Sequence, residues 1–357
     1  MKAVSLRGDA AQVSAAPVLV SEEAGAARWD AYVRRHPDGT AEHLWGWREV
    51  FARAFGHDCV YLAAERDGAV VGILPLVRYR SVLFGRFLVS LPYFNYAGVL
   101  VDDPAAAGAL LECATTLARE HGAKHIELRH RQRQFADLPA RQNKLGFARG
   151  LPATAEELWT GLDRKIRNQV RKAQKEGLTA EGGGAALIDE FYRVFAENMR
   201  DLGTPVFPRA LFTEGVRQFG RDMHVFVVRH GGHAVAGGIA VTMGDTVLVP
   251  WASSLRGFRN LSPNTLLYWS MMEWAIERGL RVFDFGRSSP GGGTQQFKEQ
   301  WGGKPRQLHT EYLMLKGEAP PDQGTTNGKL ASAIACWQRL PLPIANRIGP
   351  RIIRHLA

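Results

Sequence analysis

The chain has 357 residues, of which 45% are hydrophobic and 22% are charged, and its formal net charge at pH 7 is +10. This composition excludes a disordered chain and indicates a globular protein of about two domains. The positive charge favours an anionic partner, such as nucleic acid, anionic lipid or a phosphate-bearing substrate.

The positions of the cysteines and the lengths of the apolar runs indicate the cellular compartment of the protein. Cys59, Cys113 and Cys336 lie far apart, so we expect neither a disulfide framework nor a cysteine-rich metal site, and a reducing compartment fits. Residues 1–17 lack the apolar centre of a signal peptide, and no run reaches the ~18 apolar residues that a spanning helix needs. The sequence therefore predicts a cytoplasmic protein with no bound metal.

Two segments of the chain repeat the same order of predicted elements. Each begins with a hairpin whose turn contains glycine, formed by the runs 60–65 and 70–77 in the first copy and 225–229 and 234–242 in the second. Each continues with a helix that has proline near its start and glycine at its end, and then with a strand: 103–122 and 125–129, then 262–279 and 281–285. The repetition favours two domains of common ancestry over a chance similarity.

Hairpin, helix and strand in this order are compatible with the acyltransferase fold called GNAT. That fold holds an acyl donor where two strands diverge, with the donor phosphates against a helix N-terminus. The predicted fold class is α/β with mixed sheets, built as two tandem, duplicated GNAT-like domains. We place the domains at 17–150 and 151–316, followed by a linker and a basic tail at 317–357.

The stretch 158–177 is predicted to be a strongly basic amphipathic helix. Six cations lie between Asp163 and Glu176 with no acid among them. Such a face is most often a solvated surface. Alternatively, Arg167 and Arg171 bind the phosphates of RNA, of a nucleotide sugar or of a membrane, because the guanidinium group suits two-pronged phosphate contacts.

The stretch 282–302 is the most informative part of the chain. An apolar strand ends at the polar residues Asp284 and Arg287, a run of three glycines follows at 291–293, and Lys298 then stands between two aromatic residues. Functional residues often lie where a strand passes into a loop, and glycines permit a ligand to approach the backbone closely. A flexible surface loop is the alternative interpretation.

Several motifs follow one another in a specific order, at 92–96, 127–130, 158–177, 198–205, 250–254, 284–287, 297–298 and 301–302. Together they resemble the FemAB family, and more closely its members associated with exosortase/PEP-CTERM exopolysaccharide systems, which are grouped with the biotin-synthesis-like acetyltransferases. The resemblance covers roughly 51–315.

The resemblance implies two GNAT-like domains that share one substrate cleft and transfer an acyl or aminoacyl group onto an amine. The best-known members of the family use aminoacyl-tRNA and add amino acids to peptidoglycan precursors. This chain lacks the long heptad segment with which FemA-type proteins recognise tRNA, so acyl-CoA and aminoacyl-tRNA both stay open as the co-substrate. The implied acceptor is a saccharide or peptide precursor of the cell envelope or of an exopolysaccharide.

The resemblance places Lys298 at the reaction centre, where an ammonium group can stabilise the oxyanion or the leaving oxygen. The chemistry of two neighbouring residues makes them further catalytic candidates. Asp284 can accept the proton of the amine or hold Arg287, and Arg287 can bind a carboxylate or a phosphate. The alternatives are a simple Asp284–Arg287 ion pair and a surface role for Lys298.

Further residues are expected to bind substrate. They are Tyr93, Asn95, Tyr96 and Arg129 in the first half, and Arg167, Arg171, Asp201, Thr204, Trp251 and Ser253 in the second. Tyrosine and asparagine offer hydrogen bonds and flat contact area, which suit a sugar or a peptide, although a packed aromatic loop is an equal alternative. The histidines, including His57, His130 and His309, show no spacing of a nucleophile–base pair or of metal ligands and are predicted to be structural.

The last segment changes character. Basic and apolar residues alternate over 329–357 around Trp337, and prolines interrupt the helical pattern. Such a segment can lie on an anionic membrane surface, which makes peripheral attachment to the inner membrane face a hypothesis. Packing of the tail on its own domain is the alternative.

For the whole protein, a non-catalytic GNAT-like module that binds polysaccharide or nucleic acid is the second function class.

Overall fold

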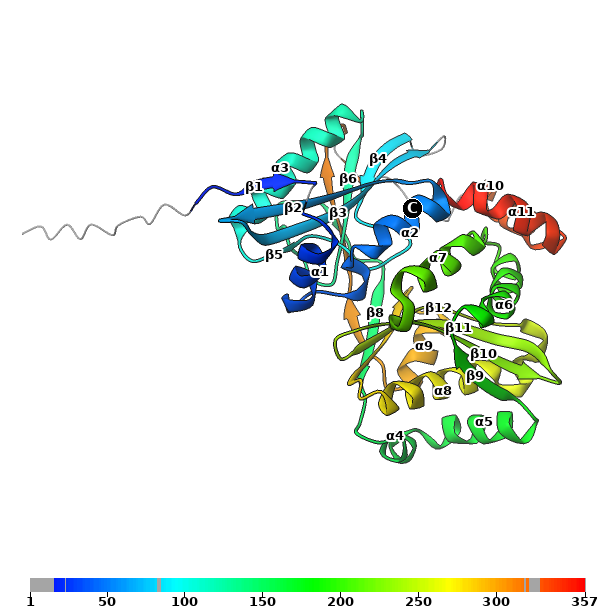
Figure 1. Cartoon of the computed structure of the whole chain (residues 1–357). Helices are drawn as coiled ribbons and strands as arrows, with labels where there is room; N and C mark the ends of the chain where they lie inside the picture. The colour runs from blue at the N-terminus through cyan, green and yellow to red at the C-terminus, as the bar shows by residue number, and fades with distance from the viewer. Residues whose placement is uncertain (1–15, 23, 82–84, 318, 321–327, 357) are drawn as a thin grey trace, which may run out of the picture.

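The computed structural model describes residues 16–22, 24–81, 85–317, 319–320 and 328–356. These residues form two mixed β-sheets, each with helices on both faces, and Figure 1 shows the sheets as two bodies of one chain. The predicted fold class, α/β with mixed sheets in two halves, is therefore confirmed. Most of the linker predicted after residue 317 lies outside the described residues.

The first sheet has eight strands among the described residues; seven follow the order β1-β2-β3-β4-β6-β15-β7, and β5 pairs with β3. The strands are β1 (Leu19–Ser21), β2 (Asp58–Arg66), β3 (Ala69–Ser81), β4 (Gly85–Val89), β5 (Leu100–Val101), β6 (His125–His130), β7 (Ala140–Arg141) and β15 (His309–Met314). The β2–β3 hairpin turns at Asp67 and Gly68, whose φ angles are 51° and 76°. Both positions need positive φ, which is why Asp-Gly predicted this turn correctly.

Helices cover both faces of the first sheet. They are α1 (Ala26–Arg35), the 3₁₀ turn η1 (Ala41–His43), α2 (Gly46–Phe55) and α3 (Pro104–Glu120). The Asp103 side chain caps α3 by accepting a hydrogen bond from the Ala106 N–H at 3.0 Å, as the Asp-Pro pair predicted. The side chain of Leu62 packs on the α3 side of the sheet, whereas Tyr61 packs with α1 and α2 on the opposite side.

The second sheet has seven strands among the described residues, in the order β14-β8-β13-β12-β11-β10-β9. They are β8 (Leu145–Gly150), β9 (Thr179–Gly183), β10 (Met223–His230), β11 (His233–Met243), β12 (Thr246–Ser254), β13 (Val282–Ser288) and β14 (Lys304–Gln307). The β10–β11 hairpin turns at Gly231 and Gly232, which both have positive φ, so the second predicted hairpin is also confirmed.

Two helical layers enclose the second sheet. One face carries α4 (Ala155–Gly161), α5 (Arg164–Lys175) and α8 (Pro263–Glu277). The other face carries η2 (Ala185–Leu187), α6 (Ile188–Asp201) and α7 (Arg209–Phe219), and the remaining elements are η3 (Gly220–Asp222), η4 (Arg256–Leu261) and α9 (Gly293–Gln300). In Figure 1, α5 lies on the side of the second sheet that is remote from the first sheet.

The two sheets exchange strands. β8 follows the first half of the chain but pairs with β13 and β14 in the second sheet, and β15 ends the second half but pairs with β6 in the first sheet. The predicted division between residues 150 and 151 therefore does not coincide with the sheets. The physical reason is that the pairing partner of a strand is set by contacts distant in sequence, which the strand's own residues do not reveal.

One hydrophobic cluster contains residues of both halves and joins them. Trp251 of the second sheet packs against Phe94 of the first half, with ring centroids 5.7 Å apart, and against Phe212 of α7 at 5.3 Å. Trp47 of α2 completes the cluster, with its ring 4.5 Å from that of Phe94. Because these large rings are almost fully buried, the halves are fixed relative to each other and the space between them is a defined cleft.

Two helices, α10 (Gly328–Gln338) and α11 (Leu342–Ile353), end the described chain and are red in Figure 1. α11 buries Ala345, Gly349 and Ile353, and the Ile353 carbonyl accepts a hydrogen bond from the Tyr93 hydroxyl at 3.1 Å. The tail thus packs on its own protein, as the alternative interpretation expected. No helix among the described residues is long and apolar enough to cross a bilayer.

Gly349 allows the close approach of α11 to the loop after α6. A Cβ atom at this position would lie 2.9 Å from the Val206 backbone nitrogen and 3.0 Å from its Cγ1 atom. Gly349→Ala should therefore lower the free energy of unfolding by about 1–3 kcal/mol and expose the C-terminal segment to limited proteolysis. The control is Gly108→Ala in α3, where a Cβ meets no atom within 4 Å and where alanine should stabilise the helix. Equal responses of both variants would contradict this packing.

Candidate active site

The site lies where two parallel strands of the second sheet separate. β12 and β13 pair over only three positions, from Thr246 with Val282 to Leu248 with Asp284. Beyond Asp284, β12 continues along β11 and β13 continues along β8, with an irregularity in the β13–β8 register between Asp284 and Arg287. Gly286 lies at this irregularity with a φ of 68°, which glycine adopts without strain.

The Asp284 carboxylate is buried and faces the first half of the chain. It is 4% exposed, whereas its neighbours Phe283 and Phe285 point into the core beneath α8. Its Oδ1 accepts hydrogen bonds from the Gly286 N–H at 2.8 Å and from the Tyr96 hydroxyl at 3.3 Å. Burial raises the pKa of Asp284, and the nearby charge of Arg131 opposes this shift. A carboxylate with a raised pKa is a stronger proton acceptor than an exposed one.

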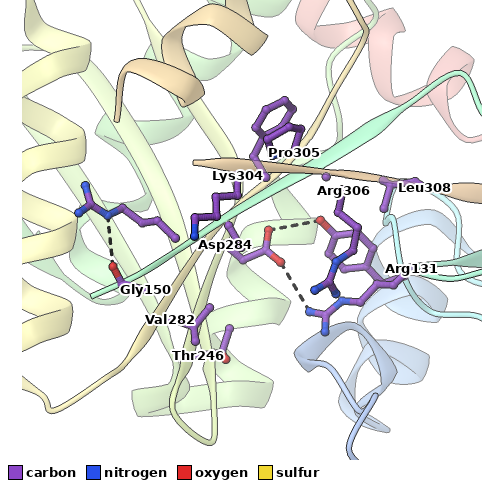
Figure 2. Close-up of a pocket in the computed structure, with 14 residues that line it drawn as sticks. Arg131, Gly150, Thr246, Val282, Asp284, Lys304, Pro305, Arg306 and Leu308 are labelled. Atoms are coloured by element: carbon purple, nitrogen blue, oxygen red, sulfur yellow. Dashed lines mark hydrogen bonds and ion pairs between the residues drawn. The ribbon is translucent and has the colours of Figure 1, made fainter. Parts of the chain in front are cut away.

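Arg131 is the cationic partner of Asp284. Its Nη2 atom lies 3.6 Å from Oδ2 of Asp284, as Figure 2 shows, and its guanidinium group lies 4.9 Å from the centre of the Tyr96 ring. The predicted Asp284–Arg287 ion pair is absent among the described residues. Arg131 was not among the predicted site residues, although it directly follows the motif at 127–130.

Glu42 positions the loop that carries Tyr96. The side chain is 0% exposed, and its carboxylate accepts hydrogen bonds from the backbone N–H groups of Asn95 at 2.8 Å and Tyr96 at 2.5 Å. Burial raises the pKa of Glu42 to about 7. Glu42 was not among the predicted site residues; the signal for it is a lone acid in a largely apolar and aromatic stretch at 40–47.

The raised pKa of Glu42 predicts a pH-dependent stability. The folded state binds the proton more tightly than the unfolded state, whose ordinary value is 4.5, so this stabilisation is complete below about pH 4.5 and is lost as the pH rises through about 7. In Glu42→Gln, the decrease in the free energy of unfolding between pH 4.5 and pH 8 should be smaller by roughly 3 kcal/mol. Urea unfolding at both pH values measures this, with the exposed Glu112→Gln as control; an unchanged decrease would contradict the assignment.

Lys298 is buried on α9 and points toward the end of β13. Its ammonium group donates hydrogen bonds to the carbonyl oxygens of Gly286 at 3.1 Å and Arg287 at 2.7 Å, and the side chain is 6% exposed. Burial lowers the pKa of Lys298 to about 8, and the negative charge of Asp284 opposes this shift. The alternative of a surface lysine is therefore excluded. The third N–H of the ammonium group has no hydrogen-bond partner among the described residues, and the centre of the Phe147 ring lies 5.7 Å from Nζ.

The Arg287 side chain is exposed and forms no hydrogen bond or ion pair with the described part of the chain. Desolvation by the surrounding protein lowers the pKa of Arg287 to about 10, and the positive charge of Arg129 adds to this effect. The charges of Glu42 and Glu127 oppose the shift. A guanidinium group that lacks a protein partner remains available for an anionic substrate group.

Some predicted substrate-binding residues lie at this site. Asn95 and Tyr96 do, since both are held by Glu42 and Tyr96 contacts Asp284. Arg129 lies nearby, but its guanidinium group is occupied by the Glu127 carboxylate at 2.7–2.8 Å and by the Phe94 carbonyl at 3.0 Å. Arg129 therefore stabilises the folded protein, and its guanidinium group is not available to bind a substrate.

Other predicted residues have partners within the protein. The Tyr93 hydroxyl contacts the hydroxyl of Tyr79 at 2.8 Å and Nε2 of His57 at 3.1 Å, beneath the tail. Trp251 lies in the shared core, and the Ser253 hydroxyl accepts a hydrogen bond from Asn198 at 3.1 Å. Tyr93, Trp251 and Ser253 were predicted to bind substrate, and the structure gives their side chains partners within the protein instead.

Four further residues lie away from Asp284. Asp201 ends α6 and accepts a hydrogen bond from Arg200 at 2.7 Å, and Thr204 follows in the loop that α10 approaches. Arg167 and Arg171 lie on α5, which packs against α8 on the remote side of the second sheet. Arg171 lies over the Trp159 ring at 5.2 Å. The basic helix is therefore separated from the cleft by the sheet itself.

The histidines of the sequence analysis have structural partners. His130 Nδ1 lies 2.7 Å from a Glu311 carboxylate oxygen, and its Nε2 accepts a hydrogen bond from the Val99 N–H at 2.9 Å. His309 contacts the Gln142 side chain at 3.3 Å. In the part of the chain that the structure describes, no group of three or more His, Cys, Asp or Glu side chains could hold a metal ion.

Two cavities meet at Asp284. One has a volume of about 400 Å³ and extends over β8, β13 and β14, and the other has about 210 Å³ and extends toward α1. Tyr96, Arg131, Thr246 and Asp284 line both. A carboxylate with a raised pKa in the wall of a cleft between two rigid sheets is the arrangement expected of an acid–base residue.

Known proteins share this architecture and part of this sequence. The family described as "Acetyltransferase (GNAT) domain" matches residues 162–299, a stretch that contains Asp284, Arg287 and Lys298. The lipid II:glycine glycyltransferase of Staphylococcus aureus is 28% identical over 201 residues, which are 49% of this chain and 45% of that protein. The chain is thus similar to less than half the length of this relative.

Solved structures support the fold. The crystal structure of FemX matches with a TM-score of 0.62 at 17% identity, over 80% of this chain and 95% of FemX. A tandem GNAT protein from the clavulanic acid biosynthesis pathway matches with a TM-score of 0.52 at 13% identity, over 85% of this chain and all of that protein. The prediction of tandem GNAT-like halves is confirmed at the level of the fold, and residues 162–299 match the GNAT acetyltransferase family.

Proposed function

We propose that the protein transfers an acyl or aminoacyl group from a phosphate-bearing donor to an amine on a cell-envelope or exopolysaccharide precursor. The observation that carries this proposal is the environment of Asp284, a buried carboxylate with a raised pKa at the point where β12 and β13 separate. The GNAT match over the same strands supports transfer over binding alone.

The residues of the site can carry out each step of the reaction. Asp284 accepts a proton from the attacking ammonium group, and the neutral amine then forms a C–N bond with the donor carbonyl carbon. The tetrahedral intermediate that results breaks its bond to the leaving sulfur or oxygen, and the proton held by Asp284 passes to the leaving group. The second proton of the amine nitrogen is released to water as the amide forms. Arg287 and Lys298 supply positive charge on the side of β13 where the strands have separated.

The geometry of Lys298 makes its proposed role more specific. Two of its three N–H groups bind the carbonyl oxygens of Gly286 and Arg287, so the residue also fixes the backbone that follows Asp284. The remaining N–H of Lys298 can donate a hydrogen bond to the oxyanion or to the leaving oxygen, and its positive charge stabilises either of them.

The donor is acyl-CoA or aminoacyl-tRNA, and a thermal-shift titration distinguishes them. A ligand that binds only the folded state adds about 2.7 kcal/mol of stability at a hundredfold excess over its dissociation constant. Coenzyme A and charged tRNA are titrated in parallel, followed by transfer assays with acetyl-CoA and aminoacyl-tRNA on amine acceptors. No shift and no transfer with either donor would contradict the proposed function.

The acceptor belongs to the cell envelope in this proposal because the S. aureus relative is named for transfer to lipid II. Association with exosortase/PEP-CTERM systems, cytoplasmic location and peripheral contact with the inner membrane face are parts of the same proposal. The exposed Ile344 and Ile352 on α11, beside Arg347 and Arg351, suit an anionic lipid surface. Equal sedimentation of full-length protein and residues 1–316 with anionic liposomes would remove the membrane contact.

A further inference from the structure

The floor of the larger cavity is made by small residues on one face of β8. Gly146, Ala148 and Gly150 alternate with larger residues, so one face of this strand is nearly bare. A Cβ atom at Gly146 would lie 2.9 Å from the Tyr96 hydroxyl, so glycine here also leaves space for the contact between Tyr96 and Asp284. The result is a hollow of about 400 Å³ directly beside the proposed proton acceptor.

Cations surround this hollow. In the antiparallel pairing of β14 with β8, Lys304 lies opposite Ala148 and Arg306 lies opposite Gly146, which places both side chains on the same face as Asp284. Figure 2 shows Arg306 extending toward Arg131 on one side of Asp284, and Lys304 extending past the other side of this carboxylate. Arg131, which follows β6 of the first sheet, thus lines the same cavity as Lys304 and Arg306 of β14 in the second sheet.

These charges have few partners within the protein. Lys304 and Arg306 are exposed and form no hydrogen bond or ion pair with the described residues. Arg149 also lines the hollow, but it donates to the Trp301 carbonyl at 2.6 Å and is therefore occupied. The only carboxylate in the cavity wall is Asp284, which already accepts hydrogen bonds from Gly286 and Tyr96.

We propose that Arg131, Lys304 and Arg306 form a binding site for a phosphate or diphosphate ester group of a substrate. Arg131 is paired with Asp284, whereas Lys304 and Arg306 have no anionic partner among the described residues. Such charges attract an anion, and guanidinium groups form two-pronged hydrogen bonds with phosphate oxygens. The volume suits a diphosphate with part of its ester group. A phosphate bound here places the rest of the substrate next to Asp284.

The choice of phosphate follows from the number and type of donors. One carboxylate of a substrate would satisfy one guanidinium group, whereas three cations around one hollow match the greater charge and the several oxygens of a diphosphate. This inference rests on the proposed function and makes it more specific, because it names residues that bind a phosphate group of a substrate. The acyl donor and the amine acceptor can each carry such a phosphate group.

The test is isothermal titration of the full-length protein with inorganic pyrophosphate, in parallel for wild type and the double variant Lys304→Ala/Arg306→Ala. Loss of two charge-assisted contacts should weaken binding by about a hundredfold. The matched control is Lys172→Ala/Lys175→Ala on α5, which removes the same charge on the remote side of the second sheet and should change affinity less than twofold. All four positions are exposed, so circular dichroism should show unchanged folding.

Two further ligands identify the source of the phosphate. Coenzyme A represents the donor and uridine diphosphate represents a nucleotide-linked acceptor; the ligand whose affinity falls in Lys304→Ala/Arg306→Ala is the one that this site takes. No binding of pyrophosphate at millimolar concentration, equal affinity in this variant, or an equal loss in the α5 control would overturn the proposal.

Binding is measured without turnover, which separates this inference from the proposed function. Asp284→Asn removes the only carboxylate of the cavity wall, so it should bind pyrophosphate at least as tightly as wild type. If pyrophosphate binds as expected while no acyl transfer is found with either donor, the proposed function fails and the phosphate site stands.

Discussion

Asp284→Asn is expected to lower the rate of acyl transfer by about 10²–10⁴-fold, which is the contribution of a positioned general base. The amide of asparagine can still accept the hydrogen bonds of Gly286 and Tyr96, but it cannot take a proton from the amine. Because burial raises the pKa of Asp284, the rate of the wild type should increase with pH as this carboxyl group ionises. The variant should lose this acidic limb of the pH profile.

Single-turnover transfer between pH 5 and pH 9 measures both effects. The control is Asp137→Asn, which changes an exposed aspartate that is remote from the cavity walls. A variant Asp284→Asn that retains the wild-type rate and pH profile would show that proton acceptance lies elsewhere. Glu42, also buried and with a pKa raised to about 7, would then be the next candidate.

Lys298→Met is expected to lower the transfer rate by about 10²-fold or more, because it removes a positive charge from the site of the developing oxyanion. Methionine has a similar length but cannot donate hydrogen bonds. The carbonyl oxygens of Gly286 and Arg287 would lose their donor, at a cost of about 1–3 kcal/mol of unfolding free energy for each buried group. Both the rate and the stability should therefore decrease.

The pH profile distinguishes catalysis from a purely structural role. The pKa of Lys298 is lowered to about 8, so the wild-type rate should fall above that pH as the ammonium group deprotonates, and Lys298→Met should lack this alkaline limb. Lys175→Met, on the exposed face of α5, serves as control. If Lys298→Met loses stability but keeps the wild-type rate below its unfolding temperature, Lys298 only supports the backbone.

Local sequence signals predicted much of the fold. The Asp67-Gly68 and Gly231-Gly232 turns identified both hairpins, because few other residues adopt positive φ. The Asp103-Pro104 pair marked the start of α3 for a similarly local reason. The exchange of β8 and β15 between the sheets could not be predicted, because strand pairing depends on residues far apart in the sequence.

The candidate site was predictable only in part. Asp284 and Lys298 stood out because a strand end, a glycine run and an isolated lysine follow one another in a short stretch. Glu42 and Arg131 come from other parts of the chain, and their approach to Asp284 depends on the packing of the two halves. Arg129 was predicted to bind substrate, but its guanidinium group is paired with Glu127. Residue type alone does not reveal such a pairing.

We expect the substrates to meet where β12 and β13 separate, on the face of the second sheet that is turned toward the first. Hydrogen–deuterium exchange with acetyl-CoA and, separately, with charged tRNA locates the bound donor. The donor that stabilises the protein should slow exchange in 246–254, 282–288 and 94–97. Slower exchange confined to the basic helix at 158–177, with these three segments unchanged, would contradict the claim.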